Sequence, residues 1–395
     1  MSFDDAKLNR IKSHLDSYVT DEKISGYDIE LTSPTGSIYR AMNGYSRRES
    51  QQDTDENTIY RIYSMTKPIT SIAAMILYER GYFDLNDPID AFIPSFGSPT
   101  VYVSGAATAP AVRPATSKIK VWHLLTHTSG LTYGFLHAHP TDEIYRINGF
   151  DLSWPEDKGP SELIDSVAAL PLVADPGTIW NYSMSTDVLG RLIEVATGKK
   201  LGEFFQEEIF EPLGMTSSSF EVDPAKRSDL SQLYFSIGGG KIVPVGDLEG
   251  GSRNGFHSGG GGLYSTTDDY VKFSRFLLNR GKVGSERILS PRTFDTMVTS
   301  HLPKGHDLST FGRPIFAESD FEGVGFGLGF SVVEDPTAGK TLASTGTFGW
   351  GGMASTALSV DPVEEFAMVF MTQVVPSSTY PVRKELTRLI YTSMI

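Results

Sequence analysis

A serine and a lysine three residues apart stand at the start of a long apolar stretch. The segment Tyr60–Ser71 reads YRIYSMTKPITS and contains Ser64 and Lys67. The next residues, SIAAMILYERG, are apolar and favour a helix. Pro68 is compatible with the first turn of that helix, because first-turn N–H groups have no acceptor within the helix. We therefore predict that Ser64 lies at the mouth of a largely buried helix, with Lys67 on the same face.

These residue types suit nucleophilic catalysis. A serine hydroxyl becomes an effective nucleophile once a neighbouring base takes its proton. A desolvated lysine close to the positive potential of a helix N-terminus can act as that base. The helix start also offers the backbone N–H of Ser64 to a developing oxyanion. The alternative is that Ser64 caps the helix, a position at which serine is favoured. Burying Lys67 is costly without a function, which favours the catalytic interpretation.

The chain contains a second match to the S-x-x-K pattern, in TSKIKVWHLL, where Ser117 and Lys120 have the same spacing. The residues Lys118 to Val121 alternate polar and apolar, which predicts an extended backbone. In an extended segment residues i and i+3 point to opposite faces and lie roughly 10 Å apart. We therefore interpret Ser117 as a loop residue.

A serine–lysine pair needs a third group to pass the proton to the leaving group. The segment DPGTIWNYSMSTDVLG offers Tyr182, on the connection between a Pro-Gly turn and a helix that starts near Asp187. A phenol on such a connection can be presented into a cleft. The alternative is a core tyrosine whose hydroxyl binds a backbone group.

The elements that position these residues fall into three parts of the chain. We predict a helix over residues 4–22 and two strands over Tyr27–Tyr39. A mostly helical region follows over residues 65–220. Within it we predict helices at 187–196 and 201–210 and a loop at 100–118. Strand-like runs follow (GFGLGFSVVED, STALSVDP and EFAMVFMT), and 383–395 is helical again. The nearly continuous apolar run EFAMVFMT suits a central strand. Strands at both ends of the chain predict one sheet built from both termini with an inserted helical part.

Several collinear segments resemble the serine β-lactamase-like superfamily: SMTK at 64–67, LLTHTSGL at 124–131, NYSMSTDVLGRLIEVATG at 181–198, FFQEEIFEPLGM at 204–215 and GGGGLYSTTDDYVKFSRFLLNRG at 259–281. That superfamily includes class C β-lactamases, D,D-peptidases and family VIII carboxylesterases. The resemblance implies an α/β domain, mainly an antiparallel sheet flanked by helices, formed by 1–64 and 220–395, and a mostly helical domain, 65–219. It places the active site in the cleft between them. It implies Ser64 as nucleophile, Lys67 as base and Tyr182 as proton relay.

Two departures from the β-lactamase pattern bear on the substrate. The tyrosine motif carries Met184 where class C β-lactamases have an asparagine that binds the substrate amide. Trp350-Gly351-Gly352 stands where the Lys-Thr-Gly motif offers a cation to the substrate carboxylate, and family VIII carboxylesterases are similar in this respect. We expect Trp350 to form an apolar wall, both glycines to let the strand approach the substrate, and the Met353 N–H to be the second oxyanion donor. An alternative alignment uses Ser344-Thr345-Gly346.

Other candidate sites in the sequence are weaker. The G-x-S-x-G elbow of α/β-hydrolases is absent, and Gly259 to Gly262 is interpreted as a turn before a helix. His123 and His127 have the i, i+4 spacing of a helical zinc site but lack the H-E-x-x-H glutamate, so we interpret them as structural. Tyr133 is expected to line the cleft. No metal and no organic cofactor is expected.

Composition and charge exclude several classes of binding partner and of catalytic chemistry. The chain has 395 residues, a formal net charge of −14 and no cysteine. The acidic surface argues against nucleic acid and anionic membranes as partners, and the absence of cysteine excludes disulfides and thiolate catalysis. The N-terminal residues show no signal-peptide pattern and no segment is apolar enough for a membrane span, so we expect a cytoplasmic protein. Composition does not indicate the oligomeric state.

The combined expectation is a serine carboxylesterase that hydrolyses short- to medium-chain acyl esters through an acyl-enzyme on Ser64. The departures at Met184 and Trp350 point to a small neutral ester as substrate. Three alternatives stay open: a β-lactamase or D,D-peptidase, an acyltransferase with the same three residues, and a non-catalytic binding protein with this fold.

Overall fold

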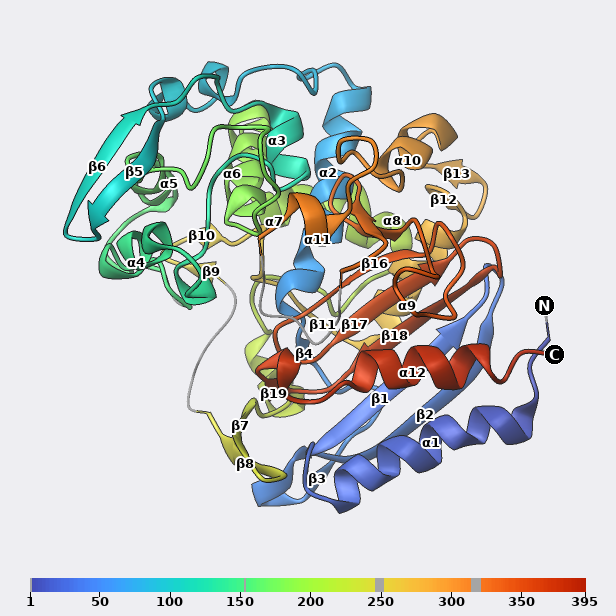
Figure 1. Cartoon of the computed structure of the whole chain (residues 1–395). Coiled ribbons are helices and arrows are strands. Elements are labelled where there is room, and N and C mark those ends of the chain that lie inside the picture. The colour runs from blue at the N-terminus through green and yellow to red at the C-terminus, as the bar shows by residue number, and fades with distance from the viewer. Residues whose placement is uncertain (1, 153, 246–251, 314–320) are drawn as a thin grey trace.

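The structure is a computed structural model that describes residues 2–152, 154–245, 252–313 and 321–395 (Figure 1). Its centre is an eight-stranded antiparallel sheet in the order β14-β15-β16-β17-β18-β1-β2-β3. The strands are β1 Gly26–Thr32, β2 Ser37–Arg47, β3 Gln52–Asp53, β14 Val324–Phe326, β15 Ser331–Val333, β16 Phe348–Gly351, β17 Ala357–Asp361 and β18 Phe366–Met371. β1 pairs with β18, with Ile29 opposite Phe370. The prediction of one sheet built from both ends of the chain is confirmed.

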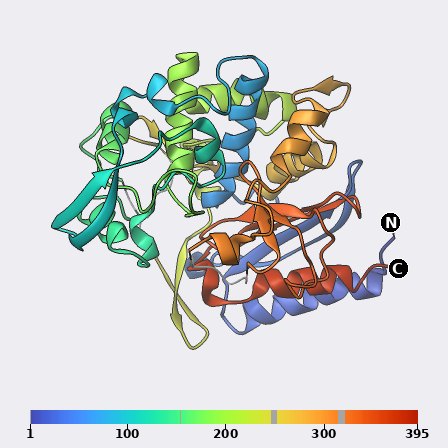
Figure 2. The same cartoon turned by 45° about the horizontal axis from the view of Figure 1, so that its top comes forward.

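Both faces of the sheet are buried at its central strands β1 and β18, and β18 shows why its sequence is continuously apolar. Phe366, Met368 and Phe370 face the core formed with α1 (Asp5–Thr20) and α12 (Val382–Tyr391). Ala367, Val369 and Met371 face the core on the opposite side, which includes α9 (Thr267–Leu278). Alternating side chains of a strand point to opposite faces, so a strand covered on both sides needs apolar residues at every position. Figure 2 shows α1 and α12 on one side of the sheet and most other helices on the other.

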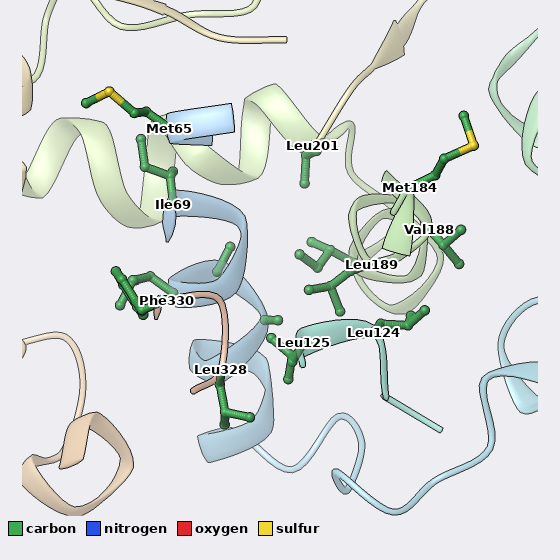
Figure 3. Close-up of a cluster of buried hydrophobic side chains, with 14 of the residues drawn as sticks. Met65, Ile69, Leu124, Leu125, Met184, Val188, Leu189, Leu201, Leu328 and Phe330 are labelled. Atoms are coloured by element: carbon green, nitrogen blue, oxygen red, sulfur yellow. The ribbon is translucent and has the colours of Figure 1, made fainter. Parts of the chain in front are cut away.

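The predicted helical region forms around α2 (Thr66–Glu79), whose residues from Thr66 to Leu77 are all buried. The other helices are α3 Val121–Leu125, α4 Pro140–Ile147, α5 Pro160–Ala168, α6 Ser185–Thr197, α7 Leu201–Phe205 with a π-helical turn Gln206–Phe210, and α8 Glu211–Leu213. Apolar side chains from α3, α6 and the loop after β14 surround α2, among them Leu125, Leu189 and Leu328 (Figure 3). A helix covered on all sides holds its polar residues where water cannot reach them.

The prediction of a loop at residues 100–118 is wrong. β5 (Thr100–Ala106) and β6 (Ala109–Pro114) form an antiparallel hairpin, with Tyr102 opposite Val112. The Ala, Pro, Ser and Thr content of this segment is typical of loops, but a two-stranded ribbon has edge positions that tolerate proline. The hairpin is anchored where the Tyr102 N–H donates to the Leu172 carbonyl at 3.0 Å. That contact joins residues 70 positions apart, which local composition does not indicate.

Short strand pairs tie the helical region to the sheet. β4 (Tyr60–Arg61) pairs with β11 (Tyr264–Ser265), which brings the segment before Ser64 beside the segment that follows the four glycines. β19 (Val374–Val375), β7 (Tyr234–Gly238) and β8 (Lys241–Pro244) form a three-stranded sheet, and β9 (Ser252–Arg253) pairs with β10 (Phe256–His257). The remaining strands and α-helices of the described residues are β12 Lys282–Val283, β13 Glu286–Arg287, α10 Pro291–Met297 and α11 Leu308–Phe311. The division into domains at 64/65 and 219/220 stays a prediction.

Among the helices that the structure describes, none is both long enough and apolar enough to cross a membrane.

Candidate active site

Ser64 lies just before helix α2 and does not cap it. Tyr63–Met65 is a 3-10 turn, α2 begins at Thr66, and Met65 occupies the N-cap position without a side-chain hydrogen bond. The capping alternative is therefore wrong, and Pro68 lies in the first turn as predicted. Tyr63 has φ of +43°, a left-handed conformation that is uncommon for a bulky residue. Such strain is typical of functional sites, where the surrounding structure holds a sparsely populated backbone conformation in place.

The structure brings Ser64, Lys67 and Tyr182 together. The Tyr182 hydroxyl lies 2.6 Å from Ser64 Oγ, and Lys67 Nζ donates to the same oxygen at 3.2 Å. Tyr182 comes from the connection before α6, as the sequence predicted, and its ring packs against His127 with centroids 5.0 Å apart. Residues 118 positions apart in the chain thus share one hydroxyl. The distances are those of groups that can exchange a proton.

Lys67 is held by three acceptors. Besides Ser64 Oγ, its Nζ donates to the backbone carbonyl of Gly260 at 2.7 Å and to the Tyr133 hydroxyl at 3.1 Å. The side chain is only 2% exposed, and Nζ lies 4.6 Å from the centroid of the Tyr182 ring. A protonated lysine has three N–H donors, so three surrounding oxygens satisfy the ammonium form.

A buried carboxylate lies behind this cluster. Asp187 Oδ2 accepts from the Tyr133 hydroxyl at 3.3 Å, and Oδ1 accepts from Ser258 Oγ at 2.5 Å and from the Gly260 N–H at 3.0 Å. Burial raises the pKa of Asp187 above its usual value, although Lys67 and these hydrogen bonds oppose the shift. Burial and the charge of Asp187 raise the pKa of Tyr133 well above its usual value, which keeps its phenol protonated. Tyr133 can therefore donate to Asp187 while it accepts from Lys67.

The run Gly259 to Gly262 does more than turn the chain. It forms the predicted turn before β11 and α9, but the carbonyl of Gly260 also binds Lys67. A Cβ on Gly260 would lie 2.4 Å from Asp187 Oδ2 and 2.9 Å from the Tyr133 hydroxyl, so a side chain would displace the carboxylate. The sequence did not predict a role for Asp187, Ser258 or Gly260. The available signal was an aspartate at the start of an otherwise apolar helix face.

Trp350 lies on β16 and contacts Tyr182 directly. Its indole Nε1–H donates to the Tyr182 hydroxyl at 3.3 Å, and the two rings have centroids 5.4 Å apart. The indole also packs edge-on against Phe326. Trp350 lines the cavity, its role as an apolar wall for the substrate stays a prediction, and its hydrogen bond to Tyr182 is a contact that the sequence did not predict. Met184, where class C β-lactamases have asparagine, is buried and lines the same cavity.

The glycines after Trp350 face protein rather than open space. A Cβ on Gly351 would lie 2.5 Å from Arg383 Cζ, and a Cβ on Gly352 would lie 2.4 Å from the Ile62 carbonyl. Close approach by neighbouring protein groups therefore explains both glycines. Among the described residues, neither the Ser64 N–H nor the Met353 N–H has a hydrogen-bond acceptor. Both residues line the cavity, which is compatible with the predicted pair of oxyanion donors.

Ser64 belongs to the lining of a cavity of about 1340 Å³, which extends as far as Arg383 and Arg388 of α12. It is lined by the predicted site residues Ser64, Tyr133, Tyr182, Trp350, Gly351, Gly352 and Met353. Lys67 does not line it, because its ammonium lies beneath Ser64 and the two tyrosines. Further walls come from apolar side chains that include Phe135, Leu136, Trp154 and Phe256. The nucleophile is therefore accessible to a substrate while its lysine partner is shielded from water.

The two histidines interpreted as structural bind neighbouring protein groups. His123 Nδ1 accepts from the Lys120 N–H at 3.0 Å, and His127 Nδ1 lies 3.2 Å from Ser183 Oγ. Helix α3 ends at Leu125 and His127 has φ of +54°, so the two histidines do not share a helix face. Burial and Lys67 hold the pKa of His127 well below its usual value, which keeps the imidazole beside Tyr182 neutral.

The chain matches one family model, described as Beta-lactamase, over residues 11–392. Esterase EstB of Burkholderia gladioli is 28% identical to it over 352 residues, covering 85% of this chain and 82% of that protein. Monacolin J acid methylbutanoyltransferase of Aspergillus terreus is 30% identical over 346 residues, covering 84% of this chain and 80% of that protein. The solved structure of EstCE1, a hydrolase with promiscuous acyltransferase activity, has a TM-score of 0.82 at 24% identity and covers 98% of this chain and 99% of that chain. The chain therefore belongs to the Beta-lactamase family, with esterase and acyltransferase relatives of the serine β-lactamase-like fold.

Proposed function

We propose that the protein is a serine carboxylesterase that cleaves short- to medium-chain acyl esters through an acyl-enzyme. The observation that carries this proposal is the position of Ser64 Oγ, 2.6 Å from the Tyr182 hydroxyl and 3.2 Å from Lys67 Nζ, at a cavity with apolar walls. Ser64 attacks the ester carbonyl, and the amide N–H groups of Ser64 and Met353 stabilise the oxyanion.

The proton path follows from the acceptors around Lys67. With three oxygen partners Lys67 acts as a hydrogen-bond donor, so Tyr182 is the group placed to receive the Ser64 proton, once its own phenol proton has been released to solvent and it is a phenolate. This differs from the expectation of a neutral Lys67 as base. Tyr182 passes the proton to the leaving alcohol oxygen, which departs as the acyl-enzyme forms. Tyr182, again a phenolate, takes a proton from the water that attacks the acyl carbon and returns it to Ser64 Oγ as the bond from Ser64 to the acyl group breaks. Lys67 and the Trp350 indole stabilise the negative charge on the phenolate oxygen.

Two residues of the cavity lining, Met184 and Trp350, favour a neutral substrate. Met184 cannot donate a hydrogen bond to a substrate amide, and Trp350 brings one neutral donor that already binds Tyr182. An anionic β-lactam would therefore lack both the amide partner and the cation that class C β-lactamases supply at these positions. A β-lactamase or D,D-peptidase is accordingly the weaker alternative.

Acyl transfer is a second candidate. The matched methylbutanoyltransferase of Aspergillus terreus supports it, since the same acyl-enzyme can react with an alcohol or amine in place of water.

The test is to trap the acyl-enzyme. Mixing the protein with p-nitrophenyl butyrate and quenching with acid should add one butyryl group, mapped by peptide mass spectrometry to Ser64. Release of p-nitrophenol without an adduct on Ser64, or an adduct at another residue, would overturn the proposal. Repeating the reaction with added alcohols and amines, and analysing the products, separates hydrolysis from transfer.

A further inference from the structure

The turn that carries Met353 is held by more than its own hydrogen bonds. Strands β16 and β17 are joined by a tight turn in which the Gly352 carbonyl accepts from the Ser355 N–H at 3.1 Å and the Gly352 N–H donates to the Thr356 carbonyl at 2.9 Å. Ser355 is left-handed, with φ of +68°, as in three-residue hairpin connections. These bonds do not use the Met353 N–H, the second position of the turn.

Arg383, from the first turn of α12, binds this turn from the α12 side of the sheet and also belongs to the lining of the cavity. Its Nη2 donates to the Gly352 carbonyl and to the Thr356 carbonyl, each at 2.8 Å. The guanidinium lies against the Cα of Gly351, because a Cβ there would be 2.5 Å from Arg383 Cζ. Hydrogen bonds from a charged donor are roughly twice as strong as those between neutral groups.

The Gly352 carbonyl and the Met353 N–H belong to the same peptide unit. In a trans peptide the C=O and the N–H point in opposite directions. A group that fixes the direction of the Gly352 carbonyl therefore also fixes the direction of the Met353 N–H. Trp350 pairs with Leu358 in the core on the helical side of the sheet, while Gly351 pairs with Ala357 in the core on the α12 side. Arg383 thus holds the carbonyl on the α12 side.

We propose that Arg383 is a positioning residue that aims and polarises the Met353 N–H as an oxyanion donor. This inference rests on the proposed function, because it requires an oxyanion formed at Ser64. It also assigns a reason to Gly351: a side chain there would displace the guanidinium. The cation withdraws electron density through the Gly352 carbonyl, which makes the N–H of the same peptide a stronger donor.

The test compares Arg383→Met, which keeps length without charge, with Arg383→Lys, which keeps charge, and with Arg10→Met as the control. Arg10 is exposed on the neighbouring helix α1 and does not belong to the lining of the cavity. Because loss of a whole oxyanion donor costs roughly 10²–10³ in kcat, we expect misdirection in Arg383→Met to lower kcat roughly 10- to 100-fold. KM should change little, and Arg383→Lys should lie in between.

The inhibition constant of a phenylboronic acid distinguishes a positioning role of Arg383 from a merely structural role, because a structural role would leave it unchanged. It forms a tetrahedral adduct on serine whose oxygen occupies the oxyanion position, so its inhibition constant should rise in Arg383→Met by about the same factor as kcat falls. Gly351→Ala should give the same loss without removing Arg383, and the two changes combined should be far from additive. If Arg383→Met does not fold, Gly351→Ala decides the question.

The outcomes separate this inference from the proposed function. Full ester turnover by Ser64→Ala would overturn the proposed function itself. An inactive Ser64→Ala, together with unchanged kcat and boronate affinity in Arg383→Met and Gly351→Ala, would overturn only the role of Arg383. A rise in KM with unchanged kcat would also contradict it.

Discussion

Two segments of this chain carry the same S-x-x-K pattern in different surroundings. Ser64 and Lys67 span a 3-10 turn and the start of a buried helix, and Lys67 Nζ lies 3.2 Å from Ser64 Oγ. Ser117 is an exposed bend residue whose Oγ donates to the Pro176 carbonyl, while Lys120 Nζ donates to Asn86 at 3.2 Å. The sequence predicted this difference from the alternating pattern of residues 118–121.

The difference shows what the spacing of a motif can and cannot supply. Helical geometry brings residues i and i+3 together, whereas a bend followed by an extended segment separates them. Around Lys67, three oxygens from separate parts of the chain replace water. Lys120 binds an exposed partner, Asn86, and its charge does not need buried protein oxygens in place of water. Reactivity therefore depends on the buried partners of the lysine as well as on its spacing from serine.

Replacing each serine by alanine is the test for which we expect the largest effect on ester turnover. Ser64→Ala should lower ester turnover by roughly 10⁴-fold or more, because loss of the nucleophile removes the covalent path. Ser117→Ala should keep wild-type kcat with p-nitrophenyl butyrate. Both variants should show the wild-type circular dichroism spectrum. Equal activity of the two variants would remove the distinction between the two segments.

The buried carboxylate behind Lys67 is the next test. Asp187→Asn keeps the shape but removes the charge that faces Tyr133 and the Gly260 N–H, so the acceptors of Lys67 lose their fixed positions. We expect kcat to fall roughly 10- to 100-fold, part of the 10²–10⁴ that acid–base catalysis contributes. Asn86→Ala, which removes the acceptor of Lys120, is the matched control and should not change kcat. A wild-type rate in Asp187→Asn would show that the carboxylate only supports packing.

Trp350 allows its two contributions to be separated. Trp350→Phe keeps an aromatic wall but loses the hydrogen bond to Tyr182, which should cost roughly 3- to 10-fold in kcat for every ester. Trp350→Ala should in addition lower kcat/KM for bulky esters by roughly 10-fold or more, through lost apolar contact. An ester chain-length series measures both effects. If Trp350→Ala shows the same loss for all chain lengths, the indole does not select the substrate.

The smallest expected effect is on the free energy of unfolding, through His123 near Lys120 of the second S-x-x-K segment. Burial and the nearby Lys120 lower the pKa of His123 from 6.5 to about 4. The unfolded chain binds a proton below pH 6.5 but the folded chain only near pH 4, so the free energy of unfolding should fall as the pH drops through this window. His123→Gln should show a smaller fall in urea unfolding between pH 6.5 and pH 4. An equal fall in both proteins would mean that His123 is not the group responsible.

The sequence was sufficient to predict those features of the structure that depend on residues close together in the chain. The i, i+3 spacing of Ser64 and Lys67, the two-sided burial of β18 and the extended residues after Ser117 depend on local backbone geometry and on the periodicity of apolar residues. Such features can be read from a few consecutive positions. The position of Tyr182 beside Ser64 came from a resemblance over several segments, since no local pattern joins residues 118 positions apart.

Only the tertiary structure decided which groups surround Lys67 and the turn at Met353. Asp187 meets Gly260 across 73 positions, Arg383 reaches Gly352 across 31, and Tyr102 anchors a hairpin that composition indicated as a loop. In each case a carbonyl or carboxylate accepts a hydrogen bond from a group on another element. Burial makes such a partner necessary, because an unpaired polar group away from water is costly. The sequence shows that a buried lysine or arginine needs partners, but packing decides which residues these are.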